Sequence, residues 1–328
     1  MLNNSFSVNL SYVVPVFNEE LNIKPICAAI ENAFLSSGLN NYELIFVDDG
    51  SSDNTLSLIR ELQSINESIK CVSLSRNYGH QAALSAGLKY SKGEYVAVLD
   101  GDLQDPPEII NMFYKYCESG YEIVYGVRRK RKESWPKRMS YFIYYRLLSS
   151  LSNLDIPLDS GDFCLMSRRA VDVLNQLPEK NRFVRGLRTF IGFSQIGVEY
   201  ERSSRAAGEP KYSLRKLLKL ASDGIFNFSD RPLKFASSLG VLMAFASIIA
   251  GFLFIIQRML NIKILGYAPG QVPGYTSIIV FLAFLSGLQL YTLGVLGEYI
   301  SRIFLESKAR PQYIVRDLIG FELPADRA

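Results

Sequence analysis

Residues 94–102 read EYVAVLDGD, an apolar run that ends in two aspartates one residue apart. Four other short runs rich in β-forming residues lie nearby: VNLSYVVPV (8–16), YELIFV (42–47), KCVSL (70–74) and EIVYG (122–126). Segments with helical periodicity separate the five runs. This alternation is typical of βα units, in which helices cover both faces of a parallel sheet. The sequence therefore predicts an α/β domain over its N-terminal part.

Polar side chains gather directly after three of these strands. PVFNEE (15–20) ends the first, DDGS (48–51) the second and DGD (100–102) the fourth. Ligands on parallel sheets bind at the carboxyl ends of the strands, so we expect these three loops to form the site. No G-x-G-x-x-G follows the first strand, which disfavours a dinucleotide-binding protein.

The third loop predicts a divalent metal site. Mg²⁺ and Mn²⁺ prefer carboxylate oxygens together with phosphate oxygens, and Asp100 and Asp102 offer the carboxylates. Gln104 offers a neutral oxygen. An ordinary acidic turn is the alternative for an isolated D-x-D, but two further acidic loops on the same edge favour the metal. His80 is the single histidine, which excludes a His-rich zinc site.

Composition narrows the class of protein and its compartment. The formal net charge is only +4, which does not indicate binding to nucleic acid. The four cysteines form no C-x-x-C pair and are expected to be reduced core residues of a domain that faces the cytosol. No signal peptide is visible at the N-terminus, so the first domain is expected to stay in the cytoplasm.

Two long uncharged stretches, 235–257 and 264–297, predict membrane spans. At about 1.5 Å per residue the first reaches roughly 35 Å, enough for a hydrocarbon core about 30 Å thick. A pair of buried core helices is the alternative. Six basic residues precede the first span within 211–234 and four follow the second within 302–316, so the positive-inside rule places both flanks in the cytoplasm.

An amphipathic segment, YSLRKLLKLASDGIFNFSD (212–230), lies between the two parts. At helical spacing one face carries Leu214, Leu217, Leu218, Ala221 and Ile225, and the other carries Arg215, Lys216 and Lys219. This pattern predicts a helix in the membrane interface. A surface helix packed on the sheet is the alternative. Gly240, Ala244, Ala246 and Gly251 are small residues that permit close helix contacts, so a homo-oligomer is compatible with the sequence.

Five motifs carry a resemblance to a known family. They are VVPVFNEE (13–20), VDDGSSDNT (47–55), LSRNYGHQAALSAGL (74–88), DGDLQDPPE (100–108) and RAAGEPKYSL (205–214). In order and spacing the chain resembles the inverting GT-A glycosyltransferases of family two, whose nucleotide-sugar-binding sheet is Rossmann-like. The resemblance is greatest to dolichol-phosphate mannose synthase-like enzymes, and the two apolar segments resemble the membrane-anchored bacterial branch that glucosylates undecaprenyl phosphate.

The resemblance implies a donor site for a nucleotide-sugar. Pro15, Phe17 and Glu19 would line the base and ribose, and Asp49 would accept a hydrogen bond from the uracil imide. The residue chemistry agrees, because Phe17 offers a stacking face and Asp49 an acceptor. The remaining expected donor-site residues are Arg76 and Gly101, with Asp100, Asp102 and Gln104 holding Mg²⁺ or Mn²⁺.

A basic run at residues 128–138 indicates the acceptor. It holds seven cations and one acid, which suits a lipid phosphate, although a solvated charge run is the alternative. The resemblance implies that Arg128 and a second arginine bind the acceptor phosphate; Arg138 is the first choice and Arg129 another candidate. It also implies that Arg205 and Lys211 neutralise diphosphate or acceptor charge. Pro210 departs from the family, where a serine often stands.

Two further acids, Asp159 and Asp162, are catalytic candidates beside Asp102. Other inverting members use an acid at this place as a general base. A phosphate acceptor is already ionised near neutral pH, so a base is less necessary here. We expect Asp159 to order the site and Asp162 to be the second choice, with helix capping as the alternative for both.

The predicted enzyme transfers glucose from UDP-glucose to undecaprenyl (polyprenyl) phosphate with inversion. GDP-mannose and UDP-aminoarabinose are alternative donors. A polysaccharide-elongating member of the family is a rival, but Q-x-x-R-W is absent, and a channel or nucleotide-binding scaffold is the rival from another class. The expected organisation is a multi-pass protein of the inner (plasma) membrane: a cytoplasmic GT-A domain (1–210), interfacial helices (211–234), a two-helix transmembrane hairpin (235–300) and a cytoplasmic tail (301–328).

Overall fold

The computed structural model describes residues 8–128, 160–180, 182–201, 231–260 and 275–322. These residues form two compact units. The first contains the described residues up to 201 and from 310 onwards, and the second contains two helices, up to residue 309. The predicted interfacial segment and several predicted site residues lie outside the described residues: Arg129, Arg138, Asp159, Arg205 and Lys211.

One mixed sheet of eight strands organises the first unit. Its order is β7-β5-β6-β4-β1-β2-β3-β8. The strands β1, β2, β3 and β4 run parallel to one another, as predicted, whereas β6 and β8 are antiparallel to their neighbours β4 and β3. The bounds are β1 Leu10–Val16, β2 Tyr42–Asp48, β3 Ile69–Leu74, β4 Tyr95–Val98, β5 Ile123–Arg128, β6 Ser160–Ser167, β7 Gln195–Tyr200 and β8 Val315–Ile319.

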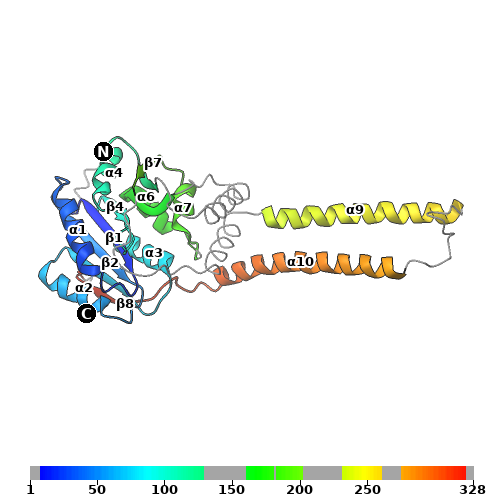
Figure 1. The fold of residues 1–328 in the computed structure, drawn as a ribbon, viewed down its shortest axis with the longest axis horizontal. Helices are drawn as coiled ribbons and strands as arrows, with labels where there is room; N and C mark the ends of the chain where they lie inside the picture. Colours follow the sequence, from blue (N-terminus) through cyan, green and yellow to red (C-terminus); the bar gives the residue numbers. More distant parts are fainter. Residues whose placement is uncertain (1–7, 129–159, 181, 202–230, 261–274, 323–328) are drawn as a thin grey trace. The chain divides into compact units, whose positions relative to one another are not determined.

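Helices form two layers, with the sheet between them (Figure 1). In one layer α1 contacts α2 and α4, and in the other α6 contacts both α3 and α7. The sheet is therefore covered on both faces, which is the predicted α/β architecture. The bounds are α1 Ile23–Leu35, α2 Thr55–Ile65, α3 His80–Tyr90, α4 Ile109–Glu118, α6 Arg168–Gln176 and α7 Val184–Phe190.

Strand β1 is buried on both faces. Tyr12, Val14 and Val16 belong to the same apolar cluster as Ile26 and Ile30 of α1. On the opposite face, α3 approaches β1 so closely that a Cβ atom at Gly87 would lie 2.2 Å from Cγ1 of Val13. The small residue at position 87 therefore sets the distance between helix and sheet.

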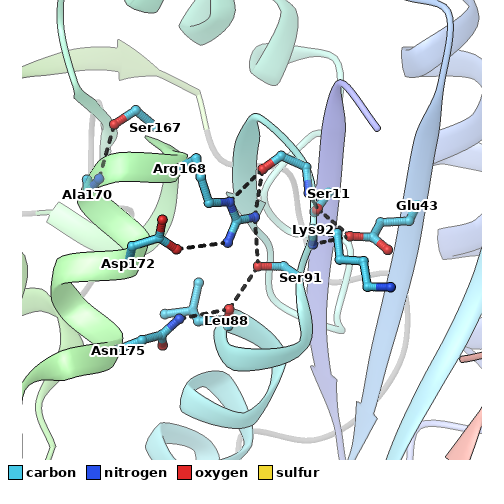
Figure 2. Close-up of polar contacts among 11 residues, drawn as sticks. Ser11, Glu43, Leu88, Ser91, Lys92, Ser167, Arg168, Ala170, Asp172 and Asn175 are labelled. Atoms are coloured by element: carbon cyan, nitrogen blue, oxygen red, sulfur yellow. Dashed lines mark hydrogen bonds and ion pairs between the residues drawn. The ribbon is translucent and has the colours of Figure 1, made fainter. Parts of the chain in front are cut away.

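A polar network fixes the amino-terminal edge of the sheet (Figure 2). Ser11 donates to the buried Glu43 carboxylate at 2.6 Å and accepts from the Gly93 amide at 2.7 Å. Two guanidinium nitrogens of Arg168 donate to the Gly93 carbonyl, at 2.9 and 2.6 Å. The network anchors the turn before β4. It lies at the edge of the sheet opposite to the one where the three predicted loops follow their strands.

The second unit consists of α9 (Arg231–Leu260) and α10 (Tyr275–Ser307), which contact each other. Figure 1 shows them side by side. Within the residues described, the structure contains no helix with the combined length and apolarity of a membrane span. The two spans, the interfacial helix and the domain limits stay predictions.

Strand β8 was not anticipated by the sequence analysis. It follows α10 and pairs with β3, with Leu318 opposite Val72. Its sequence, VRDLI, is short and carries two charges, so the strand pattern is weak. Because β8 belongs to the same sheet as β1, the chain returns to the first unit after leaving the second.

We predict that Gly87→Ala destabilises the first unit. Overpacking a core costs about 1–3 kcal/mol, and the helix propensity gained from alanine offsets about 1 kcal/mol of this cost, so the net loss should be up to about 2 kcal/mol. Urea unfolding followed by circular dichroism measures it. Lys89→Ala, at an exposed position of the same helix, is the control and should leave the midpoint unchanged. An unchanged midpoint for Gly87→Ala would contradict the packing argument.

Candidate functional site

The first two predicted loops are bonded directly to each other. The backbone amide of Asn18 donates to Ser51 Oγ at 3.0 Å, and Asn18 Oδ1 accepts from the Ser52 amide at 2.8 Å. Asn18 has a φ of 52°, a left-handed conformation that asparagine tolerates better than most residues. The loop after β1 is therefore held against the loop after β2.

Glycines stand where the loops approach most closely. A Cβ atom at Gly50 would lie 2.6 Å from the backbone carbon of Arg76, and Gly50 also has a φ of 72°. A Cβ atom at Gly101 would lie 3.0 Å from the Pro15 carbonyl oxygen. These contacts bring the predicted residues Pro15, Arg76 and Gly101 to one edge of the sheet.

The two aspartates of the DDGS loop have different partners. Asp48 is fully buried; it accepts from the Ser51 amide at 3.0 Å and from the Ser73 hydroxyl at 3.2 Å. Asp49 accepts from the amides of Tyr78 and Gly79, at 2.7 and 2.8 Å. Burial raises the pKa of Asp49, although these two hydrogen bonds oppose the shift. Asp49 thus anchors the 78–79 segment, and its predicted contact with uracil stays a prediction.

The acidic loop after β4 concentrates negative charge. Burial raises the pKa of Asp100, and the nearby carboxylates of Asp105, Asp162 and Asp102 raise it further, while His80 opposes them. Leu103 has a φ of 54°, an uncommon conformation for a non-glycine residue, and it lies between Asp102 and Gln104. The backbone amide of Gln104 donates to Asp102 Oδ1 at 3.2 Å.

This loop has the chemistry for a divalent cation, because a cation would relieve the repulsion that raises the pKa of Asp100. Among the described residues, no group of three or more histidine, cysteine, aspartate or glutamate side chains is arranged to hold a metal ion. Asp100 and Asp102 alone would therefore need further oxygen ligands, such as those of a bound phosphate group.

A second cluster lies beside Asp100. His80 Nε2 is 3.2 Å from Asp162 Oδ2 and 3.9 Å from Asp100 Oδ1. Gln81 donates to Asp162 Oδ2 at 3.1 Å, and Arg185 Nη2 lies 3.7 Å from Asp162 Oδ1. Asp162 of β6 therefore ties together the start of α3 and the helix α7.

Charge pairing controls protonation in this cluster. Burial alone would raise the pKa of Asp162, but Arg185 and His80 outweigh it and hold the pKa well below its usual range. Burial lowers the pKa of His80, but the hydrogen bond to Asp162 and the charges of Asp100 and Asp162 raise it overall to about 9. Asp162 is thus ionised near neutral pH and is a weak base, and its catalytic role stays a prediction.

Arg128 is also paired. Its Nη2 lies 3.7 Å from Asp105 Oδ2, and its Nε donates to the Tyr200 hydroxyl at 3.4 Å; that hydroxyl in turn donates to Asp105. Burial alone would lower the pKa of Arg128, but Asp105 and Tyr200 raise it. Arg128, which is predicted to bind the acceptor phosphate, therefore also anchors the acidic loop to β5 and β7.

The structure places most of the described predicted site residues at this edge of the sheet. It also places there residues that the sequence analysis did not select. Sequence reasoning missed Gln81, Asp105, Arg185 and Tyr200, and used His80 only to exclude zinc. His80 and Gln81 lie inside a motif quoted for the resemblance, so that motif was an available signal. Arg185 and Tyr200 reach the site through α7 and β7, whose positions depend on the sheet order.

Comparison with known proteins identifies the class. Residues 11–174 match the family model described as glycosyl transferase family 2. The chain belongs to this family and is a glycosyltransferase with a GT-A-like α/β nucleotide-sugar-binding fold, so the resemblance drawn from the motifs is confirmed.

Relatives match over nearly the whole chain. The chain is 45% identical to the "Uncharacterized glycosyltransferase YkcC" of Bacillus subtilis, over 96% of this chain and 95% of that protein. It is 38% identical to the "Bactoprenol glucosyl transferase" of Shigella phage SfV, over 94% of this chain and 99% of that protein. A crystal structure of glucosyl-3-phosphoglycerate synthase from Mycobacterium tuberculosis with Mn²⁺ and UDP matches with a TM-score of 0.45 and 20% identity, over 67% of this chain and 78% of that chain.

We predict that the imidazole of His80 titrates with a pKa of about 9 in metal-free buffer. Since this value exceeds the unfolded value of 6.5, protonated His80 stabilises the fold below pH 6.5, and this stabilisation is lost as the pH rises through about 9. His80 is the single histidine, so NMR of the labelled imidazole resolves it.

The same measurement on Asp162→Asn should give a pKa shifted down toward 6.5, because the hydrogen-bonded charge is gone. The control Asp172→Asn changes an exposed acid of α6 and should leave the titration unchanged. A wild-type pKa near 6.5 would contradict the pairing.

Proposed function

We propose that the protein transfers glucose from UDP-glucose to undecaprenyl (polyprenyl) phosphate. The observation that carries the proposal is the acidic loop of Asp100 and Asp102 at the carboxyl edge, beside the cations His80, Arg128 and Arg185. A site with both signs of charge suits a metal-bound diphosphate and an anionic acceptor. The relative named bactoprenol glucosyl transferase supports the same sugar and lipid.

The reaction is a single in-line displacement. An oxygen of the acceptor phosphate attacks the anomeric carbon of glucose, the bond from that carbon to the diphosphate oxygen breaks, and UDP leaves with the electron pair. Asp100 and Asp102 would hold Mg²⁺ or Mn²⁺, which supplies positive charge to the leaving diphosphate. No base is required, because the acceptor is already ionised, in agreement with the weak basicity of Asp162.

The remaining residue roles are part of the proposal. Arg128 binds the acceptor phosphate together with Arg138 or Arg129, sharing its charge with Asp105. Arg205 and Lys211 neutralise diphosphate or acceptor charge, and Asp159 orders the site. On the donor side, Pro15, Phe17 and Glu19 line the base and ribose, while Asp49 and Arg76 lie beside them.

We also propose that α9 and α10 form a transmembrane hairpin with the catalytic unit in the cytoplasm. Many of their large apolar side chains are exposed to solvent; Val241, Phe245, Phe252, Phe281 and Leu290 are examples. Such side chains require an apolar environment. The chain enters α9 from the first unit and returns to it as β8, so both flanks of the hairpin connect to the same unit.

We predict that a panel of labelled nucleotide-sugars with undecaprenyl phosphate gives transfer from UDP-glucose, and that Asp102→Asn loses most of it. Metal assistance supplies several kcal/mol to a transition state, so the loss should be about a hundredfold or more. Asp172→Asn is the matched control and should retain activity. Transfer from GDP-mannose or UDP-aminoarabinose alone would reassign the donor, and normal activity of Asp102→Asn at limiting Mn²⁺ would reject the metal site.

We predict that Gln271→Cys is labelled by a membrane-impermeant thiol reagent in intact cells. The native cysteines give a low background, because Cys71, Cys117 and Cys164 are buried and Cys27 is partly buried. Asp172→Cys, in the catalytic unit, should react only after permeabilisation. Labelling of Asp172→Cys in intact cells without labelling of Gln271→Cys would overturn the topology.

A further inference from the structure

The strand that follows the hairpin lies against the support of the DDGS loop. In the β3–β8 ladder, Asp317 is opposite Ser73 and Val315 is opposite Leu74. The Ser75 amide extends the pairing by donating to the Ile314 carbonyl at 2.9 Å. Strand β8 is therefore fixed beside the segment 73–75, directly before Arg76.

Arg316 of β8 connects to the buried carboxylate of Asp48 through one hydroxyl. Arg316 Nη2 donates to Ser73 Oγ at 2.8 Å, and Ser73 Oγ donates to Asp48 Oδ2 at 3.2 Å. The other oxygen of Asp48 accepts from the Ser51 amide at 3.0 Å. A chain of three hydrogen bonds thus leads from β8 into the DDGS loop.

The geometry determines the direction of this chain. A guanidinium only donates, so the Ser73 oxygen must accept from Arg316, and its single proton is then free to point at Asp48. Ser73 and Asp48 are fully buried, where an uncompensated carboxylate is costly. Arg316 supplies the positive charge at one end of this series of hydrogen bonds and fixes the rotamers of Ser73 and Asp48.

A second path leads to the neighbouring carboxylate. Ser75, which is bonded to the segment before β8, has its Oγ 3.0 Å from the Tyr78 hydroxyl. The Tyr78 amide donates to Asp49 at 2.7 Å. Both aspartates of the loop are therefore linked to the segment 73–75, which pairs with β8 and with Ile314 directly before it.

We propose that Arg316 is a positioning residue for the nucleotide-sugar: through Ser73 it holds Asp48 and so fixes the loop that carries Asp49. The inference rests on the proposed function, in which this loop binds the nucleotide. It assigns to the segment after the hairpin a part in donor binding. The acceptor side lies at other strands and should not depend on Arg316.

The test measures UDP binding, with Mn²⁺, to the full-length protein by calorimetry, together with the KM values for both substrates. Arg316→Ala should raise the Kd for UDP and the KM for UDP-glucose about three- to tenfold, the size of effects passed through a neighbouring residue. The KM for undecaprenyl phosphate should stay within about twofold. Arg316→Lys should restore part of the affinity, because it keeps a donor and the charge.

Two further variants separate positioning from loss of the strand. Arg60→Ala removes the 3.0 Å ion pair between α2 and Asp317 of the same strand. Asp317 Oδ2 also lies 3.4 Å from Arg316 Nε, but the hydrogen bond from Arg316 Nη2 to Ser73 is kept, so the Kd for UDP should be unchanged. Ser73→Ala should also raise the Kd for UDP. The double variant Arg316→Ala/Ser73→Ala should have a Kd for UDP no higher than that of the single variant with the higher Kd.

Three outcomes would overturn the inference: equal UDP affinity of Arg316→Ala and wild type, an equal loss in Arg60→Ala, or full additivity of the double variant. Failure of the wild-type protein to bind UDP would instead overturn the proposed function. The two failures are thus distinguishable.

Discussion

The parallel ladder that joins β4, β1 and β2 is the constraint on which the rest of the structure depends. Parallel strands place their carboxyl ends at one edge, so the loops after residues 16, 48 and 98 must meet there. The ladder is buried on both faces, with Tyr12 and Val14 packed toward α1 and Val13 toward α3. The absence of a Cβ atom at Gly50 and Gly101 then allows the loops to approach each other closely.

Concentrating acids at one edge requires cations to balance them. Asp162 is balanced by His80 and Arg185, and Asp105 by Arg128. Burial and three neighbouring carboxylates raise the pKa of Asp100, and the charges of His80 and Arg128 oppose them only in part. This imbalance is the physical reason to place a divalent cation at Asp100 and Asp102. The same ionic contacts also connect α3, β5, β6 and α7 around the loops.

The hairpin is inserted between two parts of one catalytic unit. The chain leaves the unit before α9 and returns as β8, which completes the sheet beside β3. If the segments do span a membrane, as proposed, both connections must lie on the same side of it. The return strand also places Arg316 beside Ser73, so the last strand of the fold supports one of its first loops.

The sequence by itself determined the parallel core, the three loops at its carboxyl edge and the family. Hydrophobic runs with turn residues indicate strand ends directly, and Asp100 and Asp102 are separated in the chain only by Gly101, so no folding is needed to bring them together. It did not determine the partners of these residues, because His80, Asp162 and Arg185 are distant in sequence and meet only through the order β6-β4-β1 and the placement of α7. Strand β8 was missed for a related reason: a short charged segment becomes a strand only when β3 offers it an edge. Charge compensation, and with it the contacts of Asp162 and Arg316, was decided by the tertiary structure.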